Sequence, residues 1–359
     1  MTSSPVRIGT RGSALALAQA TTVRDGLVAH GVAAELEIIT TQGDRRPPDT
    51  AWGEGAFVTA IADALLAGRI DVAVHSAKDV PTDEDPRLVL AAFLERAPSG
   101  DVVVVPTGRS AAALADLAPN ARVGTDSPRR TAFLRAVRPD LRLHPLHGNV
   151  DTRLRRLEAG ESDALVLAEA GLTRLDRGDR IAFRLPPDVV PPAPGQGALA
   201  VQVRADDAET RGLVALLDDA ATRRAVTLER ELLAASGGGC RAPLGASATV
   251  AEDGGLEMIA GFARPDGSLA TITRRRTTAG RSAGGAGSPE ADQRLVDTEL
   301  VEAVLGDLAR AASGFAVAAE WPGVLVTRSA DQAPALALAL VDRGLAPVVV
   351  PAIEIEPRP

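Results

Sequence analysis

Residues 7–20 read RIGTRGSALALAQA, and residues 122–136 read RVGTDSPRRTAFLRA. Each stretch passes from an apolar strand pattern through Gly-Thr and a serine into a pattern typical of a helix. A second repeated pair follows in the same order, GRIDVAVHS at residues 68–76 and GESDALVLA at residues 160–168. Because each half has a strand, a helix, a strand, another helix and a short strand opened by Gly-x-x-Asp, the sequence predicts two similar α/β lobes.

The order of elements also predicts how the chain moves between the lobes. Ser13 is expected to be the N-cap of the first helix. The proline-dense residues 186–194 are expected to cross between the lobes, and residues 195–204 to return to the first lobe as a strand. The predicted elements of the first lobe are strands 6–10, 34–41 and 70–75 and helices 13–28 and 57–66.

Arginines gather where such lobes bind ligands, which is outside the carboxyl ends of the strands. The helix starts after Thr10 and Thr125 offer free N–H groups for an anion, and a guanidinium suits a carboxylate. The alternative is a set of solvated surface arginines in an Arg-rich chain. We predict a ligand with several carboxylates, bound by Arg11, Arg129, Arg130, Arg153 and Arg174.

Lys78 is the only lysine, since 38 of the 39 basic residues are arginine. Its position indicates a site that needs a compact ammonium, although chance survival of a surface lysine is the alternative. Lys78 and Asp79 follow the apolar strand in HSAKDVP, where Pro81 is expected to stop the strand. Asp79 could then present a carboxylate to developing positive charge, and a solvated turn is the alternative.

A third, small α+β domain is expected from about Asp218 onward. Three glycines precede Cys240 and would let its thiol approach a ligand closely. The thiol is either a nucleophile or an inert buried group. The Gly/Ser/Ala-rich residues 279–287 are expected to be a disordered loop. The predicted elements are helices 222–235 and 291–311 and strands 246–250, 256–263 and 270–277.

Composition excludes several classes of protein. The net charge of -8 argues against a nucleic-acid surface. The start of the chain has no signal-peptide pattern, and no apolar stretch is long enough to span a membrane, so a cytoplasmic protein is expected. One cysteine cannot form a disulfide within the chain or a cysteine metal site, and no metal is expected.

Five segments together resemble the hydroxymethylbilane synthase (porphobilinogen deaminase) family. They are HSAKDVP at 75–81, GTDSPRR at 124–130, HGNVDTR at 147–153, PAPGQGA at 192–198 and GGGCRAPLG at 237–245. The resemblance implies two lobes like those of periplasmic binding proteins and a small α+β third domain that carries the cofactor cysteine. The implied domains are residues 5–94 with 192–213 for the first lobe, 100–188 for the second lobe and 216–316 for the cofactor-bearing domain.

The resemblance implies a transferase that joins four porphobilinogen molecules head to tail and releases ammonia, giving the linear hydroxymethylbilane of tetrapyrrole and haem biosynthesis. It implies a monomer, a dipyrromethane cofactor joined to Cys240 by a thioether, and Asp79 with Lys78 as the catalytic residues. Cofactor binding falls to Lys78, Ser76, Thr125, Ser127, Arg129 and Arg130, and substrate binding to Arg11, Ser13, Arg153 and Arg174.

The chain departs from the family where basic residues are common. Glu54 and Thr59 stand in place of lysines, and His147 and Gly100 in place of arginines. Each departure removes a possible partner for a carboxylate. The alternative function is therefore a degenerate family member, or a protein that binds a small anion without turnover.

Residues 323–359 are expected to form a separate β-α-β unit, with strand 323–329, helix 330–343 and strand 347–355. This stretch resembles the start of uroporphyrinogen-III synthase and suggests a functional link to that enzyme, as part of a divided or truncated bifunctional product. The alternative is an extension that packs on the third domain.

Overall fold

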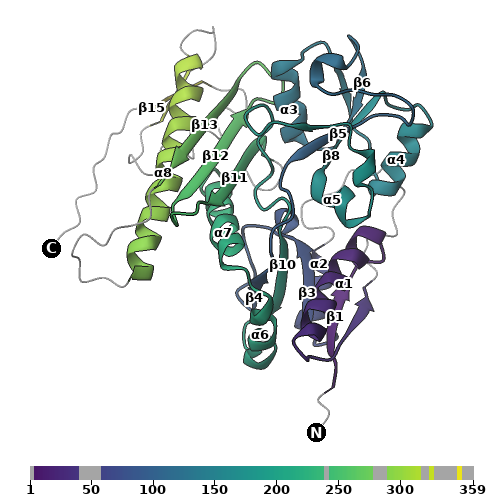
Figure 1. Cartoon of the computed structure of the whole chain (residues 1–359). Helices are drawn as coiled ribbons and strands as arrows, with labels where there is room; N and C mark the ends of the chain where they lie inside the picture. The colour runs from purple at the N-terminus through teal and green to yellow at the C-terminus, as the bar shows by residue number, and fades with distance from the viewer. Residues whose placement is uncertain are drawn as a thin grey trace, which may run out of the picture. The chain divides into compact units, whose positions relative to one another are not determined.

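The computed structural model describes residues 4–39, 58–237, 242–277, 289–316, 323–326 and 346–349. The chain divides into two compact units (Figure 1). The first unit is Met1–Asp126, Asp140–Leu185 and Gly195–Arg224, and the second is Ser127–Pro139, Pro186–Pro194 and Ala225–Pro359. Two five-stranded sheets lie in the first unit and a three-stranded sheet in the second, so the predicted α/β lobes and α+β part are confirmed.

The first sheet has the strand order β2-β1-β3-β10-β4. β1 is parallel to both of its neighbours, whereas β10 is antiparallel to β3 and to β4. The predicted return of residues 195–204 to the first lobe is therefore confirmed. The elements of this lobe are β1 Val6–Thr10, α1 Ala14–Ala29, β2 Ala34–Ile38, α2 Thr59–Leu66, β3 Val72–Ser76, η2 Ala77–Asp79, β4 Leu88–Phe93, β10 Leu199–Arg204, α6 Ala208–Val214 and η5 Ala215–Leu217.

The second sheet repeats this plan with the order β7-β6-β8-β5-β9. β6 is parallel to β7 and β8, and the antiparallel β5 stands where β10 stands in the first sheet. The repeat predicted from sequence is confirmed. The elements are β5 Asp101–Val104, η3 Leu114–Asp116, β6 Arg122–Gly124, β7 Arg142–His144, α4 Val150–Glu158, β8 Ala164–Ala168, α5 Glu169–Arg174, η4 Gly178–Arg180 and β9 Phe183–Leu185.

An arginine–aspartate pair explains the repeated Gly-x-x-Asp. Arg7 at the start of β1 donates from Nη2 to Asp71 Oδ1 at 2.8 Å. In the second lobe, Arg122 at the start of β6 donates from Nη2 to Asp163 Oδ1 at 3.1 Å. The preceding glycine in each copy follows the end of a helix with a positive φ, which glycine adopts without strain. Each pair thus joins the first strand of a lobe to the turn that opens its central strand.

Apolar strands are possible because both faces of the first sheet are covered. Val72 and Val74 of β3 lie in one buried cluster together with Val23 of α1. Ala73, between them, lies in the opposite cluster with Leu65 of α2. Successive side chains of a strand point to opposite faces, so an uninterrupted apolar run is the expected pattern for a strand with helices on both sides.

The second unit contains the antiparallel sheet β11-β12-β13 (Figure 1). Its core joins Leu232 of α7, Met258 of β12 and Val304 of α8. Helix α3 also belongs to this unit, since a Cβ on Gly261 of β12 would lie 2.9 Å from Cζ of Phe133. The elements are α3 Pro128–Val137, α7 Ala220–Ala235, β11 Leu244–Val250, β12 Leu256–Ala263, β13 Ala270–Arg276 and α8 Pro289–Ala316.

Two details differ from the sequence prediction. Strand β3 ends at Ser76, well before Pro81, because the chain turns into a short 3-10 helix in which Val80 N donates to Ala77 O at 3.3 Å. Helix α3 packs with the third sheet, although the predicted limits put it in the second lobe. The predicted loop 279–287 lies outside the described residues, as does Cys240. No described helix has the length and apolar character needed to cross a bilayer.

In the C-terminal stretch, β14 Gly323–Val326 pairs in parallel with β15 Ala346–Val349. The two strands form a sheet of their own, apart from the three larger sheets. This confirms the first part of each predicted strand; the rest of both strands and the predicted helix 330–343 lie outside the described residues.

Deleting residues 321–359 is expected to leave the melting temperature of the remaining chain unchanged to within about 2 °C, because a two-stranded sheet adds little stability by itself. Thermal unfolding of the full and shortened chains, followed by circular dichroism, measures this. A clear drop in the melting temperature would instead show that the stretch is part of the third domain's packing.

Candidate active site

The turn after β3 presents the sole lysine and the predicted catalytic aspartate. Residues 72–75 of β3 are buried, and the 3-10 helix η2 then carries Lys78 and Asp79 at the carboxyl end of the strand. Lys78 Nζ donates to Gln196 Oε1 at 3.3 Å. Asp79 is exposed. The ammonium is therefore oriented by a neighbouring amide, while the adjacent carboxylate remains accessible.

The segment Gly195, Gln196 and Gly197 approaches this turn so closely that its glycines are required. A Cβ on Gly195 would lie 2.9 Å from Lys78 N, and one on Gly197 would lie 2.3 Å from Ala97 O. Both glycines also have positive φ values, +74° and +89°. Neither the space nor the backbone conformation admits an ordinary side chain. The two segments that join the lobes thus pass in direct backbone contact beside Lys78.

Gln196 connects this turn to the second sheet. Its Nε2 donates to Ser99 O at 2.6 Å and to Asp101 Oδ1 at 2.8 Å, and both Gln196 and Asp101 are buried. Sequence reasoning missed Gln196 as a functional residue, although it lies in the quoted PAPGQGA segment. A glutamine between two glycines, at the start of the predicted strand 195–204, was the available signal.

Arg174, the last residue of α5, lies on the other side of the same segment and donates from Nη2 to Gly197 O at 2.6 Å. Burial lowers the pKa of Arg174 to about 10. Within the described part of the chain, no carboxylate pairs with this guanidinium. A partly desolvated cation whose partner is a carbonyl oxygen suits an anionic ligand. This arrangement fits a substrate and a cofactor that carry carboxylates.

The start of α1 contributes the next group of predicted residues. Ser13 is confirmed as the N-cap, since its Oγ accepts from Ala16 N at 3.3 Å. Ser76 Oγ accepts from Gln19 Nε2 at 2.8 Å, so the end of β3 is joined to α1. Gln19 is buried and was not among the predicted site residues.

Helices α1, α4 and α5 converge near this point. A Cβ on Gly171 of α5 would lie 3.8 Å from Val150 Cγ2, at the start of α4, and 3.9 Å from Leu15 Cδ2, near the start of α1. The starts of α1 and α4 therefore meet beside α5. This brings the segments that carry Arg11, Arg153 and Arg174 into one region of the first unit.

The HGNVDTR segment forms the start of α4. Asn149 caps the helix by accepting from Thr152 N at 2.9 Å. Arg153 Nη2 donates to Asp126 Oδ2 at 2.9 Å, and His147 Nδ1 lies 3.0 Å from Asp126 Oδ1. Asp126 was not predicted, although it lies in the quoted GTDSPRR segment.

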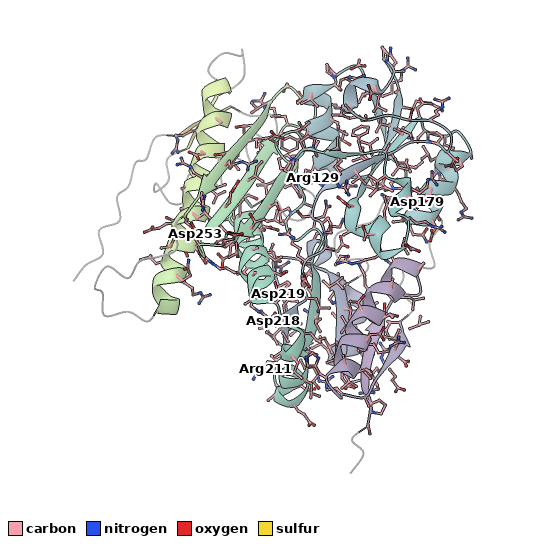
Figure 2. The ribbon with its side chains drawn as sticks, viewed as in Figure 1. Arg129, Asp179, Arg211, Asp218, Asp219 and Asp253 are labelled. Atoms are coloured by element: carbon pink, nitrogen blue, oxygen red, sulfur yellow. The ribbon has the colours of Figure 1, made fainter. Side chains whose placement is uncertain are left out.

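The remaining predicted cations lie at the start of α3, in the second unit. Ser127 caps α3 by accepting from Arg130 N at 3.3 Å. Arg129, labelled in Figure 2, is 3% exposed and donates from Nη1 to Pro191 O. Arg130 is 6% exposed. The alternative that these two arginines are solvated surface residues is therefore wrong.

The structure thus groups the predicted residues by unit. Thr125 is buried at the end of β6 in the first unit. Of the positions expected to differ from the family, Glu54 lies outside the described residues, and Thr59 begins α2. The first unit holds Arg11, Ser13, Ser76, Lys78, Asp79, Thr125, Arg153 and Arg174, the second holds Ser127, Arg129 and Arg130, and Cys240 lies outside the described residues.

Two repeated α/β lobes with fixed, partly buried cations define a two-lobed α/β protein suited to an anionic ligand. Comparison with known families identifies which one. The model described as "Porphobilinogen deaminase, dipyromethane cofactor binding domain" matches residues 6–212, and "Porphobilinogen deaminase, C-terminal domain" matches residues 223–286. The chain belongs to the porphobilinogen deaminase family.

Curated relatives agree with this. The porphobilinogen deaminase of Mycobacterium marinum is 51% identical over 248 residues, which cover 69% of this chain and 78% of the relative. That of Mycobacterium tuberculosis strain H37Ra is also 51% identical over 248 residues, covering 69% and 79%. The chain is therefore a transferase of porphyrin biosynthesis with hydroxymethylbilane synthase activity and a dipyrromethane cofactor. The predicted family, activity and cofactor are confirmed, and the alternative without turnover is not favoured.

Similar solved structures include periplasmic binding proteins. The sulfonate-binding protein SsuA of Methylobacillus flagellatus is 17% identical with a TM-score of 0.35, over 60% of this chain and 67% of that one. An ancestral arginine-binding protein bound to arginine is 18% identical with a TM-score of 0.34, over 60% and 91%.

The buried His75, which precedes Ser76, is expected to make the free energy of unfolding depend on pH. It is buried on β3 with its Nε2 3.3 Å from Gln202 Oε1, and burial lowers its pKa from 6.5 to about 4. The folded chain keeps the ring neutral while the unfolded chain takes up a proton, so stability falls as the pH drops from about 6.5 toward about 4. Wild type should lose about 2 kcal/mol more unfolding free energy than His75→Gln between about pH 7.5 and 5. Urea unfolding at both pH values measures this, and equal losses would contradict it.

Proposed function

We propose that Asp79 and Lys78 are the catalytic residues of the hydroxymethylbilane synthase reaction. The observation that carries the proposal is the geometry at the end of β3, where Lys78 is hydrogen-bonded to the buried Gln196 and Asp79 is exposed beside it. The only lysine of the chain and a free carboxylate are thus held at the carboxyl end of a central strand, where ligands of α/β sheets bind.

The reaction calls for a carboxylate at this place. In each condensation, the bond between the aminomethyl carbon and nitrogen breaks, ammonia leaves, and a new bond forms between that carbon and the ring carbon of the next pyrrole. The ring carbon then loses its proton. Positive charge develops on the pyrrole as ammonia leaves, and the Asp79 carboxylate stabilises it. The Lys78 ammonium, a point charge, binds a carboxylate of the ligand.

We propose that the other predicted residues bind the acetate and propionate groups. Partly buried guanidinium groups suit these carboxylates, and Arg174, with a carbonyl oxygen as its partner, supports this most directly. Dipyrromethane, when joined to Cys240, supplies the pyrrole on which the chain grows. Substrate binding is assigned to Arg11, Ser13, Arg153 and Arg174, and cofactor binding to Cys240, Lys78, Ser76, Thr125, Ser127, Arg129 and Arg130.

We further propose the domain limits predicted from the sequence, and a monomer in the cytoplasm. The first lobe would span residues 5–94 and 192–213, the second 100–188 and the cofactor-bearing domain 216–316, with helix α3 of the second lobe packed on the third sheet. The parallel pair of β14 and β15 supports the reading of residues 323–359 as a partial β-α-β unit with a link to uroporphyrinogen-III synthase. The deletion of residues 321–359 described above tests whether this unit is independent.

Cys240 is expected to carry the cofactor covalently. The mass of the denatured protein should exceed the mass of the chain by two porphobilinogen units minus two ammonias, and the excess should be absent in Cys240→Ser. Intact-mass spectrometry measures both. An unmodified wild-type mass after incubation with porphobilinogen would contradict the assignment of Cys240.

Asp79→Asn is expected to lower kcat for hydroxymethylbilane formation by about 10²-fold or more, because the carboxylate acts on charge that develops only during reaction. The melting temperature should be unchanged, since Asp79 is exposed. Asp83→Asn, which removes the same charge from an exposed residue four positions later, is the matched control. Near wild-type turnover in Asp79→Asn would show that Asp79 is not a catalytic residue.

A further inference from the structure

Arg153 forms an ion pair with a carboxylate of the chain itself, that of Asp126. Asp126 follows β6 by two residues, and its Oδ2 accepts from Arg153 Nη2 at 2.9 Å. Its Oδ1 lies 3.0 Å from His147 Nδ1. All three side chains are about one-fifth exposed, so they are shielded from water more than an ordinary surface ion pair is. One aspartate therefore lies between a guanidinium and an imidazole at the carboxyl end of a central strand.

Arg153 has a second anchor that does not depend on Asp126. Its Nε donates to Gly148 O at 2.8 Å. Gly148 is fixed in turn by a φ of +116° and by Thr152, whose Cγ2 would lie 2.8 Å from a Cβ at that position. Because the Nε contact orients the guanidinium plane, the loss of Asp126 would leave Arg153 directed to the same place. Asp126 therefore is not needed to orient Arg153, and its main effect is to place a negative charge beside Nη2.

Arg156 is another charged side chain of α4 whose contacts reach this cluster. Arg156 of α4 donates to His147 O at 3.4 Å, but its charge is paired with Glu161 at 2.7 Å. Asp126 therefore lowers the positive charge that this part of the site offers to a carboxylate.

We propose that Asp126 is an internal competitor for Arg153, a built-in carboxylate that an incoming substrate carboxylate must displace. The inference rests on the proposed function of Arg153 in substrate binding. A guanidinium presents its donors in a fixed planar fork, and a carboxylate already held at Nη2 leaves an incoming carboxylate fewer donors and a partly neutralised charge. The competition weakens substrate binding in this chain and sets its KM for porphobilinogen higher than Arg153 alone would give.

Steady-state kinetics with porphobilinogen and the holoenzyme test this. Asp126→Asn keeps the shape of the side chain and removes the charge, and Asp126→Ser removes the side chain's reach as well. Both variants should lower KM by about threefold to fivefold, the range expected for the loss of a partly exposed ion pair, with a smaller change in kcat. Asp126→Glu restores the carboxylate and should return KM toward the wild-type value.

Two further variants make the outcome specific. Asp163→Asn removes the carboxylate that pairs with Arg122 in the same lobe, and should leave KM unchanged. In the Arg153→Met background, Asp126→Asn should no longer lower KM, because the competitor has lost its target. Melting temperatures of all variants show whether the fold is kept.

An unchanged or raised KM in both folded Asp126 variants, together with a raised KM in Arg153→Met, would overturn the competition and leave the binding role of Arg153 standing. An unchanged KM in Arg153→Met would overturn the binding role of Arg153, and this inference with it.

Discussion

The backbone contact at Gly197 is the constraint on which the active site depends. The two segments that join the lobes pass each other there so closely that a methyl group on Gly197 would lie 2.3 Å from Ala97 O. Ala97 N donates to Gly197 O at 3.3 Å, and Arg174 donates to the same oxygen. Lys78 and Arg174 are thus both hydrogen-bonded to the same three-residue segment, Lys78 to Gln196 and Arg174 to Gly197. A displacement of this segment would move both cations at once.

Burial, more than net charge, decides how this acidic chain binds an anion. The chain carries a net charge of -8, yet Arg129 and Arg130 are buried and burial depresses the pKa of Arg174. A partly desolvated cation interacts more strongly with a carboxylate than a solvated one does, because less water screens the pair. The same weak screening strengthens the ion pair between the part-buried Asp126 and Arg153, so Asp126 competes strongly with any ligand carboxylate for Arg153.

The sequence predicted the features that repeat and those that follow a local rule. The two lobes, the cap Ser13 and the return of residues 195–204 were predicted, because periodicity and capping depend on neighbouring residues. The short strands β4, β5 and β9 were not, since three to six residues are too few to show a clear period. Asp126 was missed because its partners lie 21 and 27 residues away in the chain. The packing of α3 against β12 could not be predicted, since an apolar helix face does not specify its partner.

The strand order of the first sheet also determines which lobe can finish folding first. β4 lies at the edge of that sheet and borders β10, which is made only after the whole second sheet. The five strands of the second sheet, by contrast, follow one another along the chain from β5 to β9, although helix α3 between β6 and β7 packs with the third sheet. On a ribosome, where the N-terminal part emerges first, the first lobe must therefore wait with a gap between β3 and β4 until the second lobe has been synthesised. The later part of the chain is the earlier one to finish folding, which reverses the usual N-terminal-first order.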